Sequence, residues 1–248
     1  MRIKFIQDII DTIRGKKKTK EPKKTISQEI LANNNISIPK KNIKNFNLVL
    51  HGKNNTIILN ENNRLSDNAI INISLNGDNN FIIFNEGFGL SSYLSIEVGR
   101  KHPNYGEVQN CSITIGEGTT IESATFVMVN SNSHIKIGKN CMFANDITLY
   151  NTDTHPVLDL STGKMINYVK GIEIGNHCWL GRNCTILKNT TIANDCIVGW
   201  GAIVSGKHTQ EHSVLAGNPA KIVKSGVTWD SNTVVHNYVQ NKIPIGEI

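Results

Sequence analysis

The sequence predicts an all-β fold of the solenoid kind, in which short parallel strands stack coil upon coil. The main observation is a six-residue period that starts at residue 174 and continues for five units. A period of six differs from the 3.6 residues of a helical turn and from the two-residue alternation of a long strand. Repetition at a fixed period is typical of solenoids. The first position of each unit is aliphatic (Ile174, Leu180, Ile186, Ile192, Val198) and the fifth is small (Cys178, Cys184, Thr190, Cys196, Ala202).

The same frame extends upstream to residue 115. It places aliphatic or aromatic residues first (Ile115, Ile121, Val127, Ile137, Phe143), with Thr119, Thr125, Ser131, Cys141 and Ile147 fifth. One inward aliphatic side chain, a Gly or other small residue at the bend and a second small inward residue describe a short strand plus a corner. Four of the five cysteines are thereby explained as compact core fillers rather than metal ligands, and Cys111 falls outside the frame.

Before residue 110 the repeats are longer and looser. Residues 50–62 (LHGKNNTIILNEN) return 25 residues later as residues 75–87 (LNGDNNFIIFNEG). The many asparagines suit corners, because Asn tolerates left-handed turn conformations and bonds to neighbouring backbone. This pattern predicts larger, irregular β coils over residues 25–110.

Two interruptions break the solenoid. Residues 100–110, with Pro103 and Gly106, indicate a surface loop. The units that begin at Leu149 and Ile174 start 25 residues apart where six are expected, so 19 residues are extra. Because loops on a rigid scaffold tend to carry functional groups, this protruding loop is the first place to look for a site.

The ends of the chain differ from the body. Four isoleucines (Ile3, Ile6, Ile10, Ile13) share one helical face, which predicts a short amphipathic helix over residues 2–14, followed by a lysine-rich linker. It would serve as a capping helix or oligomer contact, or as a weak tether to a membrane surface. The predicted divisions are residues 1–24 (helix and basic linker), 25–110 (irregular coils), 111–224 (hexad domain) and 225–248 (C-terminal cap or tail).

The distribution of charge excludes one class of partner. The chain of 248 residues has a formal charge of +6, and residues 1–24 hold nine basic and three acidic side chains, which account for all of it. The rest of the chain is formally neutral, and this argues against a broad nucleic-acid groove. No apolar run approaches the roughly 18 residues of a membrane span, and Asp8 and Asp11 interrupt the N-terminal apolar stretch. We expect a cytoplasmic protein, with residues 1–24 as the candidate peripheral contact to the inner face of the membrane.

Several motifs occur together in a fixed order. They are residues 151–156 (NTDTHP), Ile166-Asn167, residues 174–181 (IGNHCWLG) and residues 216–221 (AGNPAK). With the hexads, they make residues 111–230 resemble the hexapeptide-repeat acyltransferases, most closely the bacterial polysialic-acid and capsule O-acetyltransferases. The resemblance implies a left-handed parallel β-helix, a homotrimer, and acetyl-CoA as the co-substrate in the crevice between neighbouring prisms, with no metal.

The resemblance also implies a catalytic pair. The histidine of the Asp-x-His-Pro motif is His155, the predicted general base, and the tryptophan of the later motif is Trp179. Histidine with a pKa near 6.5 can take a proton from a sugar hydroxyl at neutral pH, which is worth ~10²–10⁴-fold. Asp153 is either an orienting partner of the ring or a turn-capping group. Trp179 either fills a subunit interface or lines a ligand crevice.

For acetyl-CoA, the resemblance implies contacts along the last coils and the turn after them. Lysines there would offset the nucleotide phosphates, although the body is neutral overall. The candidate cofactor-binding residues are Gly199, Ala202, Ser205, Lys207, Asn218, Pro219, Ala220 and Lys221.

The predicted function is transfer of an acetyl group from acetyl-CoA to a hydroxyl of a surface glycan sugar, of the capsule or sialic acid type. A non-catalytic trimeric scaffold or glycan-binding module, docked by its basic N-terminus, is the alternative. It is weaker, because a pure scaffold has no need of the Asp-Thr-His-Pro loop and the Gly-Asn-Pro-Ala-Lys turn together. A zinc enzyme of the gamma carbonic anhydrase type is weaker, since it needs three converging histidines and the eight present lack that spacing.

Overall fold

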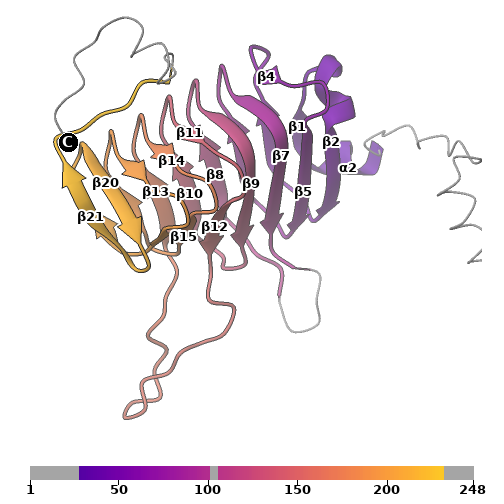
Figure 1. The fold of residues 1–248 in the computed structure, drawn as a ribbon. Coiled ribbons are helices and arrows are strands. Elements are labelled where there is room, and N and C mark those ends of the chain that lie inside the picture. Colours follow the sequence, from indigo (N-terminus) through magenta and orange to yellow (C-terminus); the bar gives the residue numbers. More distant parts are fainter. Residues whose placement is uncertain (1–27, 101–105, 232–248) are drawn as a thin grey trace, which may run out of the picture.

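The structure, a computed structural model, describes residues 28–100 and 106–231. The predicted amphipathic helix, the basic linker and the last part of the C-terminal tail lie outside the described residues. The described chain forms a row of stacked coils with a short helix, α2 (Gln28–Asn33), at its N-terminal end (Figure 1). A 3-10 helix, η1 (Lys40–Asn45), follows the first strand. No helix in the described part is long and apolar enough to span a membrane.

One face of the stack is an eight-stranded parallel sheet. Its order follows the chain, because each coil contributes one strand and the next coil lies on top of it. The strands are β1 (Asn35–Ser37), β3 (Thr56–Leu59), β6 (Phe81–Phe84), β8 (Ser112–Ile115), β10 (His134–Ile137), β13 (Gly171–Ile174), β16 (Thr191–Ile192) and β19 (Lys207–His208).

The other two faces belong to one bent sheet of 13 strands. The long strand β9 (Thr120–Met128) turns the corner, since its first residues pair with β11 and its last five with β12. The other strands are β2 (Phe46–His51), β4 (Arg64–Leu65), β5 (Ile70–Asn76), β7 (Gly89–Val98), β11 (Met142–Phe143), β12 (Ile147–Asn151), β14 (Trp179–Leu180), β15 (Thr185–Leu187), β17 (Ile197–Val198), β18 (Ile203–Val204), β20 (Ser213–Gly217) and β21 (Ala220–Ser225).

The predicted parallel solenoid is confirmed. Among the described strands, every pair is parallel except β20 with β21, which form a closing hairpin. The hexad frame is confirmed for the five units from residue 174, because their first and fifth positions are all 3% exposed or less. Upstream it fails in and after β9, where Ser131 is exposed and Thr125 is half-buried, because the long strand turns Ala124, Phe126 and Met128 inward instead. Cys111, which the frame did not explain, is buried as well, and its Sγ lies 3.3 Å from the carbonyl oxygen of Asn130.

The 25-residue repeat of the N-terminal part is confirmed by the register. Leu50 pairs with Leu75 on one face, and Thr56 pairs with Phe81 on another. The repeat therefore corresponds to one complete coil, larger than the 18 residues that separate the paired Thr185 and Ile203.

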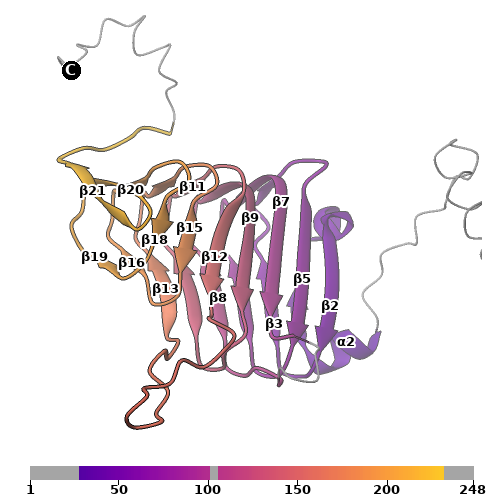
Figure 2. The ribbon, with the colours of Figure 1, turned by 60° about the horizontal axis from the view of Figure 1, so that its bottom comes forward.

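The predicted protruding loop is confirmed too. Leu149 pairs with Ile186, a step of 37 residues, which exceeds the 18-residue coil by the 19 residues expected. These residues leave the stack between β12 and β13 and project from it (Figures 1 and 2). The shorter interruption near residue 100 lies partly outside the described residues.

A column of glycines lets the coils approach closely. Gly116, Gly138 and Gly175 follow the paired residues Ile115, Ile137 and Ile174 at one corner. A methyl group on Gly138 would overlap the backbone of Gly175, and one on Gly116 would overlap that of Gly138. The second place of these units is therefore restricted by packing against the next coil.

We expect Gly138→Ala to lower the stability of the fold by about 1–3 kcal/mol, because the added methyl overlaps backbone that cannot move independently. The midpoint of urea unfolding measures this. Gly106→Ala is the matched control, since its methyl group would meet no atom within 4 Å. Equal midpoints for the two variants would contradict the packing argument.

Candidate active site

The protruding loop begins with a tight turn that presents His155. Asn151 and Thr152 are buried at the end of β12, whereas His155 is exposed. Thr154 has φ of 62° and its N–H donates to Thr152 Oγ1 at 2.9 Å. The N–H of His155 donates to the carbonyl of Asp153 at 2.7 Å. The turn thus carries His155 out of the solenoid at the loop's base.

The carboxylate of Asp153 is engaged by two other residues. Its Oδ2 accepts a hydrogen bond from Asn167 Nδ2 at 2.7 Å and lies 3.2 Å from Lys188 Nζ. Within residues 28–100 and 106–231, the imidazole of His155 makes no hydrogen bond, so the role of Asp153 in orienting the ring stays a prediction. Sequence reasoning missed Lys188, which sits at an ordinary polar place of its hexad.

Trp179 is half-buried at the start of β14, in a small aromatic cluster. The indole of Trp229 stacks on the ring of His177, with centroids 4.5 Å apart and planes at 9°. It also donates Nε1–H to the carbonyl of His177 at 2.8 Å, and its centroid lies 6.1 Å from that of Trp179. The segment after β21 therefore returns to the solenoid beside Trp179.

His155 and Trp179 stand at different corners of the prism. The loop leaves at the corner before β13, and Trp179 follows the corner after it. The four residues of β13 extend about 13 Å at ~3.3 Å per residue. Within the described part of one chain, no hydrogen bond or ring contact joins the two side chains, so a single chain does not bring this predicted pair together.

The predicted cofactor residues divide into two groups. Gly199 donates its N–H to Leu215 of β20 at 2.8 Å, and β20 leads into the exposed turn of Asn218 and Pro219. Gly199 therefore lies close to the hairpin that also contains Ala220 and Lys221. Ser205 and Lys207, also exposed, lie at or beyond the next corner, where Lys207 begins β19 on the eight-stranded face.

Ala202 is the least accessible of these candidates. Its side chain is 0% exposed, its N–H donates to Gly199 at 3.2 Å, and its carbonyl accepts from Thr185 at 2.9 Å. Any contact with a ligand would have to use the remaining lone pair of that carbonyl. The predicted contact of Ala202 with acetyl-CoA is therefore confined to its backbone oxygen.

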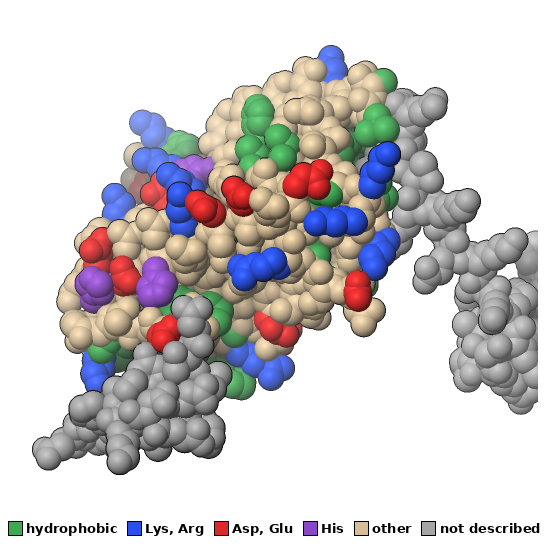
Figure 3. Space-filling view, turned by 90° about the horizontal axis from the view of Figure 1, so that it is seen from above, with side chains coloured by type: hydrophobic (Ala, Val, Ile, Leu, Met, Phe, Trp, Pro, Cys, Tyr) green, Lys and Arg blue, Asp and Glu red, His purple; other side chains and the backbone are tan. Residues whose placement is uncertain are grey.

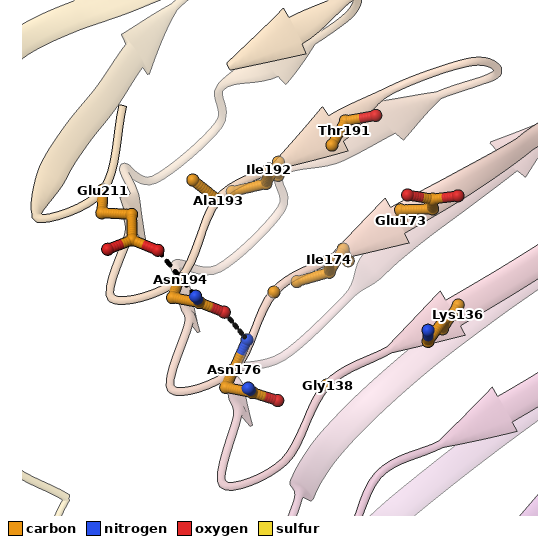
Figure 4. A pocket seen from close by; sticks show the side chains of 11 residues that line it. Lys136, Gly138, Glu173, Ile174, Asn176, Thr191, Ile192, Ala193, Asn194 and Glu211 are labelled. Carbon is orange, nitrogen blue, oxygen red and sulfur yellow. Dashed lines mark hydrogen bonds between the residues drawn. The ribbon is translucent and has the colours of Figure 1, made fainter. Parts of the chain in front are cut away.

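A groove of about 280 Å³ lies on the eight-stranded face, across β10, β13 and β16 (Figure 4). Sequence reasoning did not single it out. Asn194 accepts the N–H of Asn176 at 2.8 Å and donates to Glu211 at 2.7 Å, so these polar groups join successive coils. On the three strands that lead to this corner, Lys136, Glu173 and Thr191 stand in register.

The surface charge agrees with a neutral body. Figure 3 shows the molecule from above, and acidic and basic side chains are interspersed over the face seen in this view. No group of three or more His, Cys, Asp or Glu among the described residues is placed to hold a metal ion.

The tip of the protruding loop has a polar cluster of its own. The carboxylate of Asp159 accepts hydrogen bonds from the hydroxyl and N–H groups of Ser161 and Thr162, at 2.6 to 3.0 Å. The Ser161 hydroxyl, followed by Thr162, lowers the pKa of Asp159 from 3.8 to about 2. Hydrogen bonds that stabilise the ionised form of a carboxyl group lower its pKa in this way.

We expect Ser161→Ala combined with Thr162→Ala to return the pKa of Asp159 toward 3.8. In the wild type the bonds that stabilise the ionised turn are present above pH 3.8 and are lost as the pH falls through about 2. A carbon-13 NMR titration of the Asp159 carboxyl measures both values. A pKa that stays near 2 in the double variant would show that these hydroxyls are not the cause.

Two curated polysialic acid O-acetyltransferases are similar in sequence to this chain. No family model matches the chain. The polysialic acid O-acetyltransferase of Escherichia coli O1:K1 / APEC is 37% identical over 117 residues, which are 47% of this chain and 38% of that protein. That of Neisseria meningitidis is 35% identical over 120 residues, 48% of this chain and 55% of the relative. The chain thus spans less than two thirds of either relative.

The solved structure of the polysialic acid O-acetyltransferase OatWY matches with a TM-score of 0.61 and 29% identity, over 84% of this chain and 92% of that one. The match confirms the left-handed parallel β-helix expected from the resemblance. In sequence and in fold, the chain is similar to the hexapeptide-repeat acyltransferases, and among them to the polysialic acid O-acetyltransferases.

Proposed function

We propose that this protein is an O-acetyltransferase that moves an acetyl group from acetyl-CoA to a hydroxyl of a sialic-acid-type glycan. The observation that carries the proposal is the exposed His155 at the base of a loop that interrupts a hexapeptide-repeat β-helix. The likeness to polysialic acid O-acetyltransferases supports the acceptor class.

In the proposed reaction His155 accepts the proton of the sugar hydroxyl as its oxygen attacks the thioester carbonyl carbon. The new C–O bond forms, the C–S bond breaks, and the proton leaves with the thiol of CoA. No covalent enzyme intermediate is needed, and the exposed imidazole is free to act as a general base.

We propose a homotrimer as the working assembly. His155 and Trp179 occupy different corners of one prism, and side-by-side prisms would bring the His155 of one chain toward the Trp179 of a neighbour. In that crevice, the hairpin of Asn218 to Lys221 and the adjacent Gly199 would contact acetyl-CoA, and Lys207 would offset phosphate charge. Ser205 and the carbonyl of Ala202 complete the proposed contacts.

We further propose that the protein acts in the cytoplasm, with residues 1–24 making a peripheral contact with the membrane or an assembly partner. The net charge of +6 carried by these residues supports this placement, because basic segments are attracted to anionic surfaces. The neutral body gives no comparable attraction.

We expect His155→Ala to reduce acetyl transfer to polysialic acid by ~10²–10⁴-fold, the usual value of general-base assistance. Release of the CoA thiol measures the rate, and gel filtration with acetyl-CoA binding shows whether assembly and cofactor affinity persist. His51→Ala, an exposed histidine on β2, is the matched control. Wild-type rates in the His155 variant would rule out the proposed mechanism.

Deletion of residues 1–24 should change association with anionic vesicles or partners far more than turnover on a soluble acceptor. The reason is that the deleted segment carries the net charge, whereas the proposed catalytic residues lie beyond residue 150. Vesicle co-sedimentation and the thiol-release assay, run on the same preparations, measure the two effects. A deletion that abolishes turnover but not vesicle binding would contradict the assignment.

A further inference from the structure

We infer that the side-chain amide of Asn167 is the positioning residue for His155. The inference rests on the proposed function, since it concerns how the general base is held. Asn167 lies on the returning arm of the protruding loop, twelve residues after His155, and its side chain reaches the outgoing arm.

Three hydrogen bonds join Asn167 to the outgoing arm. Its Nδ2 donates to Asp153 Oδ2 at 2.7 Å and to the carbonyl of His155 at 2.9 Å. Its Oδ1 accepts from the N–H of Val157 at 2.8 Å. A side-chain amide carries two N–H donors and a carbonyl acceptor on the same carbon, so a carboxylate or an ammonium group could not make this set.

The same network reaches the body of the solenoid. Lys188 follows β15 on the next coil, and its Nζ lies 3.2 Å from the oxygen of Asp153 that Asn167 also contacts. Its side chain is 19% exposed, so this charge is partly shielded from water. Asp153 thereby acts on His155 through Asn167, and Lys188 ties both to the rigid stack.

The base and the tip of the protruding loop are held by different hydrogen bonds. The arms also pair through Ile166 and Val157, and the tip is closed by Asp159 with its two hydroxyl partners. Of the two polar clusters, the one around Asn167 contacts the backbone of His155. A general base must be held in a narrow range of geometry, and a displacement of about 1 Å can cost ~10²-fold in rate.

The test uses the full chain with acetyl-CoA and polysialic acid. Asn167→Ala should lower kcat by ~10²-fold while the KM for acetyl-CoA stays within about twofold, because Asn167 is not among the proposed cofactor contacts. Thermal unfolding should be unchanged, since the loop lies outside the core. A kcat equal to that of the wild type would overturn the inference.

Asp159→Ala is the matched control in the same loop. It removes the hydrogen bonds of the tip cluster without touching Asn167 or His155. Its kcat should remain within about threefold of the wild type. A loss as large as that of Asn167→Ala would mean that general order of the loop, rather than the Asn167 contacts, sets the rate.

An exchange of partners provides a rescue. Asn167→Asp alone places two carboxylates in contact, whereas adding Asp153→Asn restores the bond with donor and acceptor reversed. The kcat of the double variant should be at least about tenfold higher than that of Asn167→Asp alone. It should not reach the wild type, because the carbonyl of His155 still lacks its donor and Lys188 no longer faces a carboxylate at residue 153. No recovery would overturn the link between residues 153 and 167.

Failure of this inference can be distinguished from failure of the proposed function. An inactive His155→Ala variant beside a fully active Asn167→Ala variant overturns the positioning role only. A fully active His155→Ala variant overturns the proposed function, whatever Asn167 does. A wild type that does not use polysialic acid overturns the proposed acceptor class. Acetyl-CoA hydrolysis without an acceptor should then give the same ratios among the variants, because water can replace the sugar hydroxyl.

Discussion

In-register stacking of coils is the constraint on which the rest of the structure depends. Each strand pairs in parallel with the coils below and above it, so residues at the same hexad position lie over one another. The interior is narrow, and corners admit only small groups, as the column of Gly116, Gly138 and Gly175 demonstrates. Once the register is set, the position of every outward side chain on one of the three faces is fixed.

A scaffold of this kind leaves little room for chemistry inside. Its buried groups are aliphatic and phenylalanine side chains, small polar side chains that serve corners, and cysteines. Burial raises the pKa of one of these thiols, that of Cys184, to about 12. Functional groups must therefore stand on loops, at corners or on the outer faces of the strands. The protruding loop cannot use the core to order itself, so it relies on Asn167 at its base and Asp159 at its tip.

The arrangement of predicted site residues also follows from the prism. Gly199 is near the hairpin of Asn218 to Lys221, because consecutive coils lie in contact, whereas Lys207 belongs to another face. His155 and Trp179 are separated by β13 within one chain. One chain does not bring these residues into a single site, and this connects the proposed activity to the proposed trimer.

The sequence by itself determined the period, the 25-residue coil and the length of the inserted loop, because a repeating pattern encodes the register between neighbouring coils. It also singled out His155 and Trp179 through their motifs. Only the tertiary structure decided that Asp153 meets Asn167 and Lys188, that Cys111 fills a corner, and that Trp229 stacks on His177, 52 residues away. Such contacts join side chains from distant points of the chain, and no local pattern specifies them.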